Sequence, residues 1–267
     1  MNDYLAYIAE SLRLANLQPS EVAGTFNVAM GRGPSARKAN VDPGALIELL
    51  QQSDDDQIKP LISGFVSGVE HALLEPRHSK AAEWNFVESA GALMPIYQPP
   101  SFPMGVEAVH GQPAWVQCVS DEVVCAFVIR ISPGLRVVTA DQFERWGATG
   151  DRVFSGARSM LFHRTRELQT RQFEDFLHVR RLHAGDGHDA ARAMVYADAF
   201  YTQVGPGLRF SMPSPDHLLV IHEAGEGNLE QLRAATDEVF ETSDTPLSRA
   251  IFGFERSRPV VVEERHG

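Results

Sequence analysis

The sequence is poor in cysteine and contains no long apolar run. Only two cysteines, Cys118 and Cys125, occur in 267 residues, and neither has a partner at the spacing of a zinc site. No apolar stretch approaches the ~18–20 residues that a membrane-spanning helix requires, and the opening segment MNDYLAYIAE lacks the basic start and apolar run of a secretory signal. We therefore expect a cytoplasmic protein that has no membrane partner.

Basic residues are also fewer than acidic residues. Lys and Arg number 24 against 35 Asp and Glu, which gives a formal net charge of −11 at pH 7. Nucleic acid is therefore disfavoured as a partner, because phosphate binding needs a basic face. The 43% hydrophobic and 22% charged content is that of a folded chain with one large domain or two ordinary ones.

Both cysteines lie in the segment WVQCVSDEVVCAFVIRI. Its two β-rich runs predict a hairpin that turns at Asp121 and Glu122. A two-residue turn would place Cys118 opposite Cys125, so a disulfide is conceivable. Thiols of cytosolic proteins stay reduced, and we therefore expect the pair to be free.

A proline-rich segment predicts the division of the chain into two lobes. ALMPIYQPPSFP holds four prolines, which is typical of an edge strand that runs into an extended loop. We expect an N-terminal α+β lobe of helices and a hairpin over residues 1–91, where TFNVAM alternates as a half-buried strand does. A larger α+β lobe is expected over residues 92–267.

The C-terminal part of the chain has the clearest secondary-structure pattern. The pattern predicts strands over residues 176–184, 208–212, 217–223 and 249–254, and helices over residues 188–204 and 228–240. This order is β-α-β-β-α-β, the split βαβ arrangement of ferredoxin-like folds. The fold class is therefore predicted to be α+β, with this unit over about residues 176–254.

One stretch of this unit, HAGDGHDAAR (His183–Arg192), concentrates candidate catalytic and metal-binding side chains. In the predicted topology this stretch lies at the same sheet edge as the start of the strand over residues 217–223. The residues brought together there are His183, Asp186, His188, Asp189, Asp216 and His217. Carboxylates and imidazoles suit zinc, iron or manganese, or an acid–base pair. One hypothesis is therefore a metal-dependent hydrolase. Its metal ligands would be Asp186, His188, Asp189 and Asp216, and its catalytic residues Asp186, Asp189, Asp216 and His217.

The competing interpretation is ordinary turn and cap chemistry. Asp186 stands at the expected N-cap of the helix, and Asp189 falls in its positive first turn, where it can pair with Arg192. Gly185 and Gly187 supply the backbone freedom that a tight turn requires. This interpretation explains every residue except the histidines, and we prefer it.

Other motifs are incomplete. GRGPS (residues 31–35) lacks the Lys-Ser/Thr of a phosphate-binding loop. Ser155, in VFSGARS, lies in a helical pattern without the strand-turn-helix context of a nucleophile elbow. We therefore expect no cofactor and no catalytic serine.

Two segments of the C-terminal part are GDGHDAARAMVYADA and LRFSMPSPDHLLVIHEA. They resemble the D-G-x-D-A-S-R and P-x-x-D-x-L-I segments of the YtpQ-like family of bacterial proteins of unknown function. LRVVTADQFERWGATGDRVFSGARSML and YQPPSFP are similar to further elements, with the resemblance running from about residue 57. It implies an α+β fold and a bacterial setting, and maps the family pattern onto Asp186, Asp189, Asp216 and Arg192.

These observations favour a non-enzymatic protein-binding factor, namely a regulator, a secretion accessory or an immunity-type protein. An acidic protein associates fast with a partner that has a basic surface. The chain also lacks a complete catalytic motif. Another protein is therefore the expected partner, with the metal-dependent hydrolase as the alternative.

Overall fold

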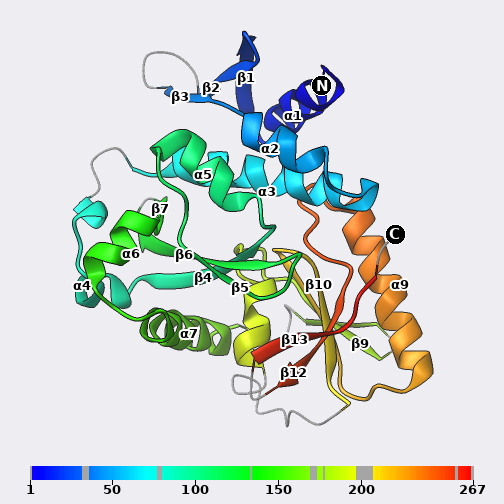
Figure 1. Cartoon of the computed structure of the whole chain (residues 1–267). Helices are drawn as coiled ribbons and strands as arrows, with labels where there is room; N and C mark the ends of the chain where they lie inside the picture. Colours follow the sequence, from blue (N-terminus) through cyan, green and yellow to red (C-terminus); the bar gives the residue numbers. More distant parts are fainter. Residues whose placement is uncertain are drawn as a thin grey trace. The chain divides into compact units, whose positions relative to one another are not determined.

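The computed structural model describes residues 2–31, 36–76, 80–132, 134–168, 173–176, 178–196, 207–255 and 258–265 (Figure 1). Helices combine with antiparallel sheets, so the predicted α+β class is confirmed. No helix within these ranges combines the length and the apolar character that crossing a membrane requires.

The chain divides into two compact units that are each discontinuous in sequence. Unit 1 comprises Met1–Ala92, Pro99–Val116 and Ala126–Ala148, and unit 2 comprises Leu93–Gln98, Gln117–Cys125 and Thr149–Gly267. The prediction had a single division between residues 91 and 92. In the structure the chain leaves unit 1 after residue 92 and then returns to it twice.

Unit 1 begins with a small sheet and three helices. These elements are α1 (Asn2–Leu14), β1 (Leu17–Val22), β2 (Thr25–Met30), β3 (Arg37–Val41), α2 (Gly44–Leu50) and α3 (Asp55–Leu74). The sheet is antiparallel in the order β1-β2-β3, one strand more than the expected hairpin. Its alternate residues Leu17, Phe26 and Val28 are buried in one core with the three helices, so one face of the sheet is covered.

The rest of unit 1 includes α5 (Phe102–His110) and β7 (Gly134–Val137), which both contact α3. It also contains η2 (Lys80–Ala82), α4 (Phe86–Ala90), most of β6 (Val124–Ile131) and α6 (Ala140–Trp146). Helices α3 and α5 cross in backbone contact. A Cβ atom on Gly68 would lie 2.3 Å from the Phe102 carbonyl oxygen, and one on Gly105 would lie 2.0 Å from that of Phe65. Only glycine permits this close approach.

Unit 2 is built on a six-stranded antiparallel sheet. The strands are β8 (Phe173–Phe176), β9 (Val179–Leu182), β10 (Arg209–Ser214), β11 (His217–Ile221), β12 (Ile251–Glu255) and β13 (Arg258–Glu263). Their order is β13-β12-β10-β11-β9-β8. The unit also contains β4 (Leu93–Gln98), most of β5 (Val116–Cys118), α7 (Gly150–Arg166), η4 (Ala190–Val195) and α9 (Glu226–Thr242).

The ferredoxin-like unit is not confirmed. The first split βαβ element is present, because β9 and β10 are both antiparallel to β11, which lies between them. The last strand, β12, pairs with β10, whereas a ferredoxin-like sheet places it beside the first strand. The predicted helix over residues 188–204 begins as the 3₁₀ helix η4, and residues 197–204 lie outside the described part.

The sheet order has a consequence for the helices. The two crossover connections run from β9 to β10 and from β11 to β12, and both move along the sheet toward β13. The strands from which they start, β9 and β11, are antiparallel to each other. Right-handed crossovers must then lie on opposite faces. The structure agrees: Leu232 of α9 packs with Leu219 and Ile251, whereas Ala193 of η4 lies with Leu218 on the other face (α9 is orange in Figure 1).

The cysteine hairpin turns where the sequence indicated. The Val123 amide donates to the Ser120 carbonyl and the Ser120 amide to the Val123 carbonyl, which leaves Asp121 and Glu122 as the two turn residues. Cys118 is exposed, Cys125 is buried, and the two form no disulfide. Burial raises the pKa of the Cys125 thiol, so this thiol is unreactive.

Candidate functional site

The residues of HAGDGHDAAR surround a fully buried arginine. Arg192, on η4, has no exposed surface. Its Nη1 donates to Asp189 Oδ1 and to Asp186 Oδ1, each at 2.7 Å, and its Nη2 donates to Asp186 Oδ2 at 2.8 Å. Two carboxylates offset its positive charge and accept from both terminal nitrogens, whereas the buried Nε has no hydrogen-bond partner among the residues that the structure describes.

The same carboxylates hold the loop between β9 and η4. Asp189 Oδ2 accepts from the amides of Ala184 and Gly185 at 2.7 and 3.0 Å. Gly185 and Gly187 have φ values of +67° and +77°, the left-handed conformation that glycine adopts without strain. The prediction that Asp186 is the N-cap was wrong. Asp189 holds that position, with helical backbone angles and no side-chain cap, because Arg192 and the loop amides engage its carboxylate instead.

The pKa values of the two aspartates move in opposite directions. Burial acts to raise the pKa of Asp186, but the hydrogen bonds and charge of Arg192 outweigh it and lower this pKa to about 2. Burial raises the pKa of Asp189 to about 6, although Arg192 and two backbone amides act against it. Both carboxylates are therefore ionised at pH 7 and compensate the guanidinium.

The turn between β10 and β11 is tied to this loop. Asp216 Oδ1 accepts from the Gly187 amide at 2.9 Å, and the Asp216 carbonyl accepts from His183 Nδ1 at 2.8 Å. The Pro215 carbonyl accepts from the Ala190 amide. Buried His188 points elsewhere, with its Nδ1 donating to the Pro95 carbonyl of β4 at 3.0 Å.

Two histidines stack at the junction of loop and turn. The rings of His183 and His217 are parallel within 3°, with centroids 4.4 Å apart. Arg181 Nη2 lies 2.7 Å from His217 Nε2, and Ser214 Oγ lies 2.8 Å from His217 Nδ1. Because a guanidinium can only donate, His217 Nε2 is an acceptor and the ring is neutral. Burial, and next the charges of Arg181 and His183, lower the pKa of His217 to about 4.

The structure thus brings the predicted residues together but gives them internal partners. Carboxylate oxygens of Asp186 and Asp189 face Arg192, and Asp216 faces a backbone amide. Among the residues that the structure describes, no group of three or more His, Cys, Asp or Glu side chains could hold a metal. Arg181 and Ser214, which complete the cluster, were missed because neither lies in a motif.

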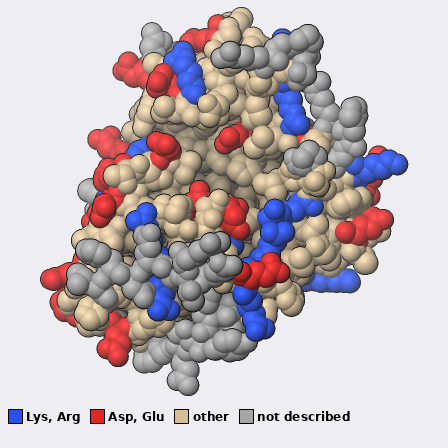
Figure 2. Space-filling view, turned by 180° about the vertical axis from the view of Figure 1, so that it is seen from behind, with Lys and Arg blue, Asp and Glu red and all other residues tan. Residues whose placement is uncertain are grey.

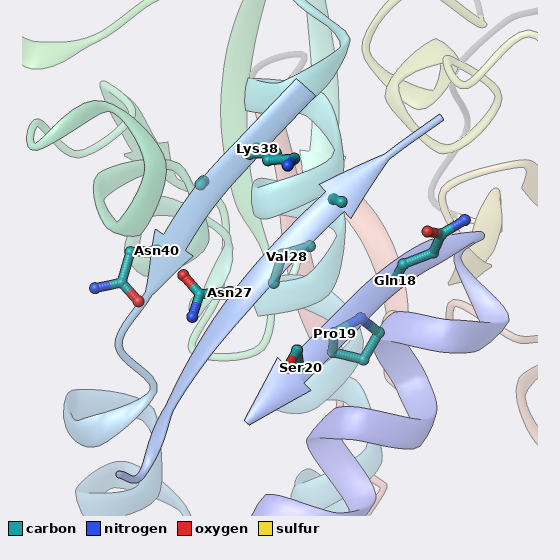
Figure 3. Close-up of a pocket in the computed structure, with 9 residues that line it drawn as sticks. Gln18, Pro19, Ser20, Asn27, Val28, Lys38 and Asn40 are labelled. Carbon is teal, nitrogen blue, oxygen red and sulfur yellow. The ribbon is translucent and has the colours of Figure 1, made fainter. Parts of the chain in front are cut away.

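A second candidate site lies on the outer face of the β1-β2-β3 sheet (Figure 3). It is a pocket of about 490 Å³, lined by Gln18, Pro19, Ser20, Asn27, Val28, Ala29, Lys38, Ala39 and Asn40. Asn27 and Asn40 are directly opposite each other in the β2–β3 register. Sequence reasoning missed this face, although the alternation of TFNVAM left Asn27 on the side away from the core.

No known protein family, curated protein or solved structure matches this chain. The geometry of the two sites is therefore the basis for inferring function.

Proposed function

We propose that this chain is a non-enzymatic protein-binding factor that engages its partner through the outer face of the β1-β2-β3 sheet. The observation that carries the proposal is the contrast between the two faces of this sheet. Leu17, Phe26 and Val28 are buried on the inner face, whereas the outer face is hollowed and exposed. A regulator, a secretion accessory and an immunity-type protein are all proteins of this class.

The chemistry of the outer face suits a protein better than a small substrate. Lys38 is the one charged side chain among the described residues that line it. Amide and hydroxyl groups of Gln18, Asn27 and Asn40 and of Ser20 both donate and accept hydrogen bonds, as peptide groups of a partner require. Small-molecule sites are enclosed cavities, whereas this pocket is open to solvent.

The net charge of −11 supports a partner with a basic surface. On the side shown in Figure 2, acidic side chains are scattered among basic and uncharged ones. The acidic charge therefore acts as a long-range field that speeds association, and added salt slows association through screening.

We further propose that the protein is a cytoplasmic, bacterial and distant member of the YtpQ-like family. Cys118 and Cys125 form no disulfide, which supports a reducing compartment. The D-G-x-D-A pattern and the arginine after it correspond here to Asp186, Asp189 and Arg192, which form one buried ion cluster. A structural role of this kind supports the resemblance without any catalytic role.

The experiment compares two arginine substitutions in the tagged full chain, expressed in its native host. Asn27→Arg places a bulky cation at the centre of the outer face, and Gln112→Arg places one at an exposed site elsewhere in unit 1. We expect one stoichiometric partner to co-purify at low salt with the native chain and with Gln112→Arg, and to be lost with Asn27→Arg. Recovery of the same partner with Asn27→Arg, or of none with the native chain, would refute the proposal.

A further inference from the structure

The stacked histidines of unit 2 occupy a junction that ties the β10–β11 turn to the loop over residues 183–189. Three contacts form this junction: His183 Nδ1 with the Asp216 carbonyl, the Gly187 amide with Asp216 Oδ1, and the Ala190 amide with the Pro215 carbonyl. His217 immediately follows Asp216 in the chain and pairs with Ser214 across the turn. A displacement of His217 therefore acts directly on these contacts.

The hydrogen bonds around the two rings assign their protons. His183 Nδ1 faces a carbonyl oxygen, which can only accept, so this nitrogen carries the hydrogen of the bond. His217 Nε2 accepts from Arg181, so its Nδ1 hydrogen points to Ser214 Oγ. Protonation of His217 Nε2 would place two donors 2.7 Å apart and break the contact with Arg181.

The groups around His217 do not stabilise its protonated form. Arg181 contacts the ring edge and His183 covers the ring face. Asp216 Oδ1 accepts from the Gly187 amide, and Asp189 Oδ2 is 4.0 Å from His183 Nδ1 but is engaged with two loop amides. On the neighbouring strand β8, Glu174 is opposite Arg181 in the register.

We propose that His217 is an acid-responsive switch, whose protonation separates it from Arg181 and His183 and releases the β10–β11 turn from the loop over residues 183–189. The charges of Arg181 and of the protonated His217 would then adjoin each other, and their repulsion favours an open arrangement. The turn and the loop are the parts that move, because the ladders β10–β11 and β9–β11 continue beyond the junction. Histidine is the side chain suited to a response in this pH range.

Hydrogen exchange of the full chain at pH 7 and pH 4.5, corrected for the intrinsic rates, tests the switch. We expect the protection of the Gly187 and Ala190 amides to fall by about tenfold at the lower pH. A difference of one pKa unit between the closed and the open state of the junction produces a change of this size. Amides of α3 serve as the internal reference and should change far less. Unchanged protection of the loop amides, or an equal loss in α3, would overturn the proposal.

Two variants separate His217 from the other acid-sensitive group of the loop, Asp189. His217→Gln keeps a neutral acceptor for Arg181, and we expect its loop protection to be the same at both pH values. A loss as large as that of the native chain would exclude His217 as the cause and overturn the proposal. If His217→Gln does not fold, a histidine NMR titration decides instead. His217 of the native chain should titrate well below 6.5, and Arg181→Met should raise its pKa by about one unit. A native value near 6.5 would also overturn the proposal.

Discussion

The β1-β2-β3 sheet and the six-stranded sheet differ in how many of their faces are covered by helices. The β1-β2-β3 sheet of unit 1 buries one face against helices and leaves Gln18, Asn27 and Asn40 exposed on the other. The six-stranded sheet of unit 2 has α9 on one face and η4 on the other. Polar groups near the first sheet are therefore free to meet a partner, whereas those near the second are engaged internally.

The comparison shows that the chemistry of a side chain in this protein follows from its burial. Asp186, Asp189 and Arg192 look reactive in the sequence, yet each satisfies another within a closed cluster. Asn27 and Asn40 look unremarkable in the sequence, yet they line the hollowed outer face. Substitutions in the buried cluster of unit 2 should therefore change the stability of the protein. Substitutions on the outer face of the β1-β2-β3 sheet should change the binding of a partner.

The largest effect is expected for Arg192→Met. This change leaves Asp189, which has no exposed surface, as an uncompensated buried charge, and breaking a buried ion pair costs about 3–5 kcal/mol. Arg13→Met is the matched control, because Arg13 and Glu10 form an exposed pair, worth less than about 1 kcal/mol. Urea unfolding measures both, and equal losses would contradict the closed-cluster interpretation.

The next largest effect contrasts the two faces of the small sheet. Leu17 is 2% exposed on the inner face, and Leu17→Ala should lower the free energy of unfolding by roughly 2–5 kcal/mol. Its neighbour Gln18 points outward, so Gln18→Ala should change this free energy by less than about 0.5 kcal/mol. A large loss in Gln18→Ala would show that the outer face is covered and would weaken the binding proposal.

A smaller effect is expected from acid. The pKa of folded His217, about 4, lies below the unfolded value of 6.5, so its contribution to stability is present above pH 6.5 and is lost as the pH falls toward 4. This shift corresponds to at most about 3 kcal/mol, which solvent screening of the half-buried ring reduces to about 1 kcal/mol.

Asp189 acts with the opposite sign. Its folded pKa, about 6, exceeds the unfolded value of 3.8, so protonation between these values favours the folded state. The measurement is therefore the difference between the native chain and His217→Gln in urea unfolding at pH 7 and pH 4.5. The native chain should lose more stability on acidification, and equal losses would remove His217 as the cause.

The smallest effect is expected for divalent metal. Manganese or zinc should leave the Tm unchanged, because Asp186 and Asp189 bind Arg192 and Asp216 binds an amide. A ligand that binds the folded state alone would raise the Tm. Metal analysis of the purified protein and a thermal scan of Asp216→Asn complete the test. A metal-dependent rise that Asp216→Asn abolishes would restore the hydrolase hypothesis.

Local sequence patterns predicted many of the elements but not all of them. TFNVAM alternates and forms β2, whereas LQPSEV forms β1 with a proline and without clean alternation. Pairing with β2 across a full register stabilises β1, and such pairing is not visible in a single segment. The convergence of the 183–189 loop with the 215–217 turn was predicted from topology, because β9 and β11 are neighbours.

The roles of the converging residues were not predictable in the same way. An arginine on an amphipathic helix is usually exposed, so the sequence alone does not indicate that Arg192 is fully buried. The pair of Asp189 with Arg192 was predicted from their spacing, whereas the bond that Asp189 accepts from the Ala184 amide, which anchors the loop, was not. Arg181 reaches His217 only because their strands β9 and β11 are adjacent.

The sequence by itself determined the α+β class, the hairpin at Asp121 and Glu122 and the glycine turn at Gly185 and Gly187, since these depend on neighbours along the chain. Tertiary structure decided the order of the six-stranded sheet and the burial of Arg192. It also decided which face of the small sheet stays open. The physical reason is that strand order follows from the handedness of long connections, and the state of a charge follows from the solvent that packing removes.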